Sequence, residues 1–75
     1  MSNESEVARL LKQIELEAQA MQQALNGPAI TARHDFIAHR YDSIGGLHEE
    51  LIPLVGEEQA TGLMYDSYRR GMEGM

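Results

Sequence analysis

The stretch TARHDFIAHRYDSIGGLHEEL, residues 31–51, decides the fold of this chain. Apolar residues recur every seven positions along and just before it: Ile30, Ile37, Ile44 and Leu51. A seven-residue repeat is typical of a helix that packs lengthwise against another helix. Pro28 suits the first turn of such a helix, and Pro53 disfavours helical geometry at the residue before it. The pattern therefore predicts one helix over residues 28–52.

Two adjacent glycines, Gly45 and Gly46, fall inside this predicted helix. Each costs about 1 kcal/mol relative to alanine in a helix interior, so a glycine pair usually interrupts a helix. The seven-residue register nevertheless continues through the pair without a slip. We therefore expect one long helix, in which the glycines let another backbone pack closely. A break at residues 43–46 is the alternative.

The segment before this helix carries a second apolar repeat. Its positions are Val7, Leu11, Ile14, Ala18, Met21 and Leu25. The alternating spacings of four and three residues predict a helix over residues 4–25. Glu4 and Glu6 suit its first turn, because the helix dipole favours negative charge there. The short connection NGP, residues 26–28, then predicts that the two helices form an antiparallel hairpin.

A third, shorter helix is expected over residues 57–70, after a turn that Gly56 closes. Apolar residues fall on one side of it: Ala60, Leu63, Met64 and Tyr68. With this helix the chain makes one small domain over residues 1–75. A domain of this size is close to the limit at which a single core suffices.

The assembly follows from the two apolar repeats. A lone hairpin covers only one side of each apolar repeat, whereas a four-helix bundle buries both sides. We therefore predict an all-α fold: an antiparallel helical hairpin with a short C-terminal helix, paired into a homodimeric bundle of the four-helix type. The expected interface residues are Leu11, Ile14, Met21, Ile30, Ile37, Tyr41, Ile44 and Leu51. The alternative is a three-helix monomer whose third helix folds back over the hairpin.

The composition of the chain excludes several classes of partner and indicates its compartment. The net charge of −6 gives a negative surface that repels phosphate, so we expect no general affinity for nucleic acid or anionic lipid. The chain has no cysteine, which excludes disulfides and thiolate chemistry and fits a reducing compartment. The N-terminus lacks the pattern of a signal peptide, and no apolar run is long enough for a membrane span. We expect a cytoplasmic protein.

Few residues suggest chemistry. Asp35 and His39 share a helix face, where a carboxylate can orient a histidine as a base or metal ligand. We expect a solvated surface pair there. His34 and His48 lie about 21 Å apart along one helix, too far to bind one ion, and we expect each to be at least half-buried and hydrogen-bonded. The sequence shows no metal-ligand spacing, nucleophile motif or phosphate loop, so we expect no metal and no cofactor.

Residues 33–41, RHDFIAHRY, resemble the arginine–polar–histidine motif of the HEPN ribonucleases. In that family these groups meet across a dimer and act on the RNA phosphate and its 2′-hydroxyl. The resemblance implies that Arg33, His34 and His39 would hold these roles, with Tyr41 following.

Most of the chain also resembles small uncharacterised bacterial helical proteins. The resemblance is carried by an LLKQIE-type first helix and by the pattern ARHDFI…IGGLHEEL…LVGEE. It implies a self-contained fold and no assigned activity.

Three hypotheses about function follow. The first is a non-enzymatic helical module that self-associates or binds another helical protein. The alternative is a HEPN-like ribonuclease that acts as a dimer. A regulatory or toxin-neutralising partner of a basic protein is a third, because the chain is small and acidic.

Overall fold

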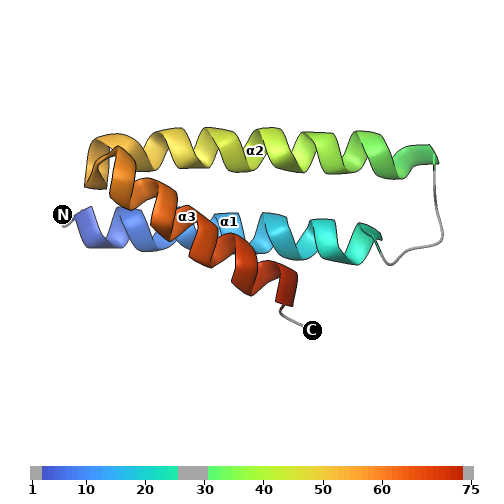
Figure 1. Ribbon diagram of the computed structural model, residues 1–75, viewed down its shortest axis with the longest axis horizontal. Coiled ribbons are helices and arrows are strands. Elements are labelled where there is room, and N and C mark those ends of the chain that lie inside the picture. Colours follow the sequence, from blue (N-terminus) through green and yellow to red (C-terminus); the bar gives the residue numbers. More distant parts are fainter. Residues whose placement is uncertain (1–2, 26–30, 74–75) are drawn as a thin grey trace.

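The computed structural model of the chain describes residues 3–25 and 31–73 (Figure 1). They form three α-helices: α1 (Asn3–Leu25), α2 (Thr31–Val55) and α3 (Glu57–Glu73). No strand occurs within these two ranges, so the prediction of an all-α fold is confirmed. The predicted connection at residues 26–28 and the expected interface residue Ile30 lie outside the described residues.

α1 forms where the alternating apolar repeat predicts a helix, with Glu4 and Glu6 in its first turn. Its apolar side faces the rest of the molecule. Four residues on that side are buried: Leu10, Ile14, Ala18 and Met21. α1 therefore supplies most of the buried apolar side chains, as expected of an amphipathic helix whose apolar side faces the core.

α2 runs unbroken through Gly45 and Gly46, as the continuous register predicts. It also continues past Pro53 and ends at Val55, beyond the expected end at residue 52. A proline biases the residue before it away from helical geometry without forbidding a helix. Pro53 therefore does not end α2, which stops two residues later.

Gly56 is the residue at which α2 ends and α3 begins. Its backbone has a φ of 91°, a left-handed conformation that glycine adopts without strain. Its N–H donates to the carbonyl of Ile52 at 2.8 Å, and its own carbonyl accepts from the N–H of Ala60 at 2.9 Å. α3 then continues to Glu73, past the expected end at residue 70. One glycine thus terminates one helix and starts the next.

α3 folds back from the end of α2 and crosses α1 (Figure 1). Ser67 and Gly71 are buried on it. A Cβ built on Gly71 would lie 2.6 Å from the Cβ of Ala18 and would also meet the backbone carbonyl of Glu15. The two helices therefore approach closely at a point where only glycine fits.

Each helix contacts the other two, and the core lies among all three. The buried apolar residues are Leu10, Ile14, Ala18, Met21, Ile44, Leu51 and Ala60. α3 thereby covers the apolar repeat of α1 within a single chain, as the three-helix alternative expects. Among the described residues, α2 contributes Ile44 and Leu51 to this set. Five further residues of α2 are partly buried against the core: Ile37, Leu47, Ile52, Leu54 and Val55.

Candidate functional site

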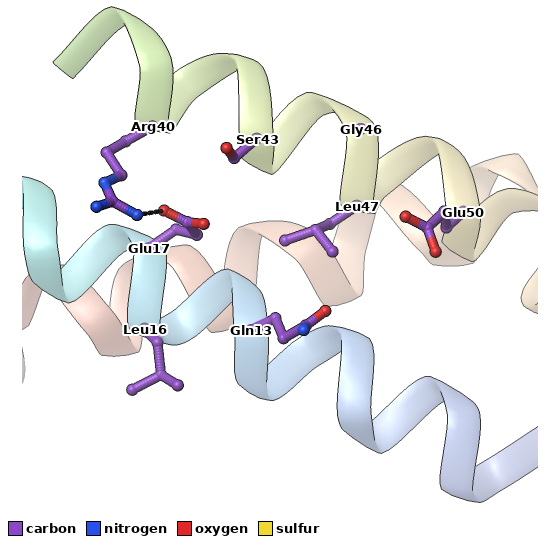
Figure 2. Close-up of a pocket in the computed structure, with 8 residues that line it drawn as sticks. All are labelled: Gln13, Leu16, Glu17, Arg40, Ser43, Gly46, Leu47 and Glu50. Carbon is purple, nitrogen blue, oxygen red and sulfur yellow. Dashed lines mark hydrogen bonds and ion pairs between the residues drawn. The ribbon is translucent and has the colours of Figure 1, made fainter. Parts of the chain in front are cut away.

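A groove of about 470 Å³ runs between α1 and α2 (Figure 2). It is lined by Gln13, Leu16 and Glu17 on α1 and by Arg40, Ser43, Gly46, Leu47 and Glu50 on α2. In Figure 2 the faint ribbon of α3 lies behind the two helices, so the groove opens on the side that α3 leaves uncovered.

An ion pair joins the two helices at one end of the groove (Figure 2). Arg40 Nη1 donates to Glu17 Oε1 at 2.6 Å, and both side chains are partly exposed. The guanidinium of Arg40 also lies 4.7 Å from the ring centroid of Phe36, a cation–π geometry. Exposed pairs contribute at most about 1 kcal/mol to stability. The main effect of these contacts is to hold Arg40 at the edge of the groove.

The α2 side of the groove carries two small residues, Ser43 and Gly46. A Cβ built on Gly46 would meet no atom within 4 Å, and the same holds for Gly45. Each glycine nevertheless lowers helix stability by about 1 kcal/mol relative to alanine. The close-packing backbone expected at this pair is therefore not supplied by the described part of the chain.

A second surface lies between α2 and α3, where the three tyrosines of the chain gather. The rings of Tyr41 and Tyr68 stack with centroids 6.5 Å apart and planes at 25°, and their hydroxyls lie 3.3 Å apart. The hydrogen bond with Tyr41, then burial and the charge of Tyr41, raise the pKa of Tyr68 to about 12. All three effects disfavour the phenolate of Tyr68. Tyr65 completes the surface and is 62% exposed.

The predicted interface residues that are described fall into three environments. Buried in the core of the single chain are Ile14, Met21, Ile44 and Leu51. Leu11 and Ile37 are partly buried and pack against that core. Tyr41 is 54% exposed. Six of these seven residues thus lie in or against the core of the single chain, and only Tyr41 is exposed.

The histidines differ in their surroundings. His48 is half-buried, and its Nε2 lies 3.2 Å from Thr61 Oγ1, so the expected hydrogen bond is present. Asp35 and His39 are both exposed, as expected of a surface pair. The side chains of Arg33 and His34 lie outside the described ones, so the site implied by the HEPN resemblance stays a prediction. Among the side chains that the structure describes, those of residues 4–25 and 35–73, no group of three or more histidine, aspartate or glutamate residues could hold a metal ion.

The sequence predicted neither the groove nor the tyrosine surface. Glu17 and Arg40 belong to no common motif, and only the packing of α1 on α2 brings them together. The same is true of Tyr41 and Tyr68, which come from different helices. One signal was available: Tyr65 precedes Tyr68 by three residues, a spacing that places two side chains on one helix face.

No family model, curated protein or solved structure matches this chain. The two resemblances noted in the sequence therefore stay predictions. In the part of the chain that the structure describes, no helix combines the length and the apolar character that a membrane span requires.

Proposed function

We propose that this chain is a non-enzymatic helical module that self-associates, with a second copy of the chain as its partner. In this proposal α1 and α2 form an antiparallel hairpin, and two hairpins pair through the groove between α1 and α2. The result is a homodimeric bundle of the four-helix type, with each α3 on an outer side. The groove, rather than the buried apolar repeat, supplies the contact.

The observation that carries the proposal is the open space at Gly46. No packing within the described residues requires a glycine there, although alanine would make the helix more stable. The distance between two packed helices depends on the side chains at their contact, so a helix can approach most closely where the Cβ is missing. A second copy of α2 that crosses near Gly46 and Ser43 would use this space.

The charges along α2 support pairing with a second copy. Arg40 and Glu50 stand five positions before and five positions after residue 45. In a two-fold, antiparallel pairing of the groove sides of two α2 helices, centred at the level of residue 45, Arg40 of each copy lies opposite Glu50 of the other. Glu50 is exposed, and no ion pair holds it among the described residues. The second copy would supply that pair.

Sedimentation equilibrium at micromolar concentration tests the proposal. We expect the wild-type chain to form a dimer. Glu50→Arg would place like charges opposite each other in the dimer and should weaken association at least about tenfold. Glu73→Arg makes the same change of charge on α3, outside the groove, and should leave the dissociation constant within about twofold.

A second pair of variants separates association from folding. Gly46→Gln and Gly62→Gln both replace exposed helix glycines that have open space around the missing Cβ. Both should stabilise the free chain, because glutamine is the better helix former. Only Gly46→Gln should weaken the dimer. A wild-type chain that is strictly monomeric, or equal effects of the paired variants on association, would contradict the proposal.

A further inference from the structure

The tyrosines of α2 and α3 form a second surface, here called the tyrosine patch. Its lining residues are Tyr41, Ile44, Gly45, Met64, Tyr65 and Tyr68. It continues along α3 to Met72. None of these residues lines the groove between α1 and α2. The patch therefore uses a different face of α2, with Gly45 in the patch and Gly46 in the groove.

The tyrosine patch holds nearly all the aromatic side chains of the chain, which has three tyrosines, one phenylalanine and no tryptophan. Tyr41 and Tyr65 are 54% and 62% exposed, whereas Ile44, beside them in the patch, is buried. Exposed tyrosines around an apolar floor are typical of the residues that dominate protein interfaces. The flexible side chain of Met64 can adapt to an incoming apolar group.

Acidic side chains border the tyrosine patch. Beside it on α3 lie Asp66, Arg69 and Glu73, all exposed. On α2, helical spacing places the exposed Asp42 and Glu49 next to the patch. The two on α2 lie three residues before and four residues after Gly45, on the same side of the helix. Arg69 forms an ion pair with Asp66, with its Nη2 3.4 Å from Asp66 Oδ1. The border therefore has more negative than positive charge, like the whole chain with its net charge of −6.

We propose that the tyrosine patch docks a basic, amphipathic segment of another protein. Tyrosine ring faces attract the cations of arginine and lysine, and carboxylates at the border would pair with them. Ile44 and Met64 would receive the apolar side chains of the segment. A second copy of this chain does not fit, because it would set one acidic border against another. The inference does not depend on self-association, which uses the groove.

A synthetic peptide tests the inference. The probe is an amphipathic, helix-forming peptide of about 18 residues, built from leucine, lysine and arginine. A peptide with glutamate in place of every lysine and arginine is its control. Because the chain has no tryptophan and its three tyrosines all line the patch, tyrosine emission reports docking directly. We expect a saturable change in emission with the basic peptide and none with the acidic one.

Variants then distinguish docking at the patch from general attraction between opposite charges. Titration calorimetry should show the basic peptide binding to Tyr65→Ala at least about tenfold more weakly than to the wild-type chain. Leu25→Ala removes an apolar side chain of 46% exposure at the end of α1, outside both the groove and the patch, and should leave the affinity for the basic peptide unchanged. Equal affinity for Tyr65→Ala and the wild-type chain would overturn the inference, as would no binding of the basic peptide.

A matched pair of charge variants locates the acidic border. Glu73→Gln and Glu50→Gln each remove one negative charge, but only Glu73 lies beside the patch. Glu73→Gln should weaken peptide binding more than Glu50→Gln does. Equal effects of the two variants would mean that the peptide responds only to the net charge of the chain, and would overturn the inference. The peptide should also bind Glu50→Arg, the variant designed to separate the two copies. That result would hold whether or not the wild-type chain dimerises.

Discussion

Tyr68 is a residue whose acid–base behaviour depends on a contact between helices. We expect it to titrate at a pKa of about 12, raised from 10.0 mainly by its hydrogen bond with Tyr41. Absorbance of the phenolate, followed against pH, measures this. Tyr41→Phe removes the hydrogen bond and should lower the pKa of Tyr68 towards 10.0. Tyr65→Phe removes an exposed tyrosine that takes no part in this hydrogen bond, and should leave the pKa of Tyr68 at about 12.

The same shift makes stability depend on pH in alkaline solution. Because the folded chain keeps the proton of Tyr68 more tightly than the unfolded chain, the stabilisation is fully present below pH 10.0. It should be lost as the pH rises from there through about 12, where the folded chain also releases the proton. Urea unfolding across this window should show a steeper fall for the wild-type chain than for Tyr41→Phe. Parallel curves would contradict the assignment.

At the scale of the helices, the contact of α3 with α1 depends on Gly71. Gly71→Ala would force a Cβ to within 2.6 Å of the Ala18 Cβ and against the Glu15 carbonyl, so one helix must shift. We expect a loss of about 1–3 kcal/mol in the free energy of unfolding, measured by urea denaturation. Gly62→Ala is the control: it lies in the same helix with open space around it, and should stabilise by up to about 1 kcal/mol. Equal stability of both variants would contradict the close approach.

The ends of the helices show what local sequence could predict and where it stopped short. The apolar repeats predicted three helices, and the register through Gly45 and Gly46 predicted that α2 would not break. The end of α2 was expected at residue 52, because Pro53 is a strong local signal. The structure places the turn at Gly56 instead, where a left-handed backbone and two backbone hydrogen bonds join α2 to α3.

At the scale of the whole molecule, the net charge of −6 bears on the ribonuclease alternative. A surface of this sign repels the phosphate backbone, and His39 is exposed on α2. We expect the purified chain to leave single-stranded RNA uncleaved at physiological salt, with His39→Ala behaving identically. Product analysis on a denaturing gel measures this. Cleavage by the wild-type chain that His39→Ala abolishes would restore the HEPN alternative.

The sequence by itself determined the all-α fold of the described residues and roughly where each helix lies, because apolar periodicity, acidic first turns and glycine-induced turns act over a few neighbouring residues. It also predicted that His48 would be hydrogen-bonded, though not that Thr61 would be its partner. Tertiary structure alone decided that α3 covers the apolar side of α1, and that Arg40 meets Glu17 and Tyr41 meets Tyr68. These contacts join different helices, and the pairing of their faces depends on the shape of the whole packed core rather than on any local signal.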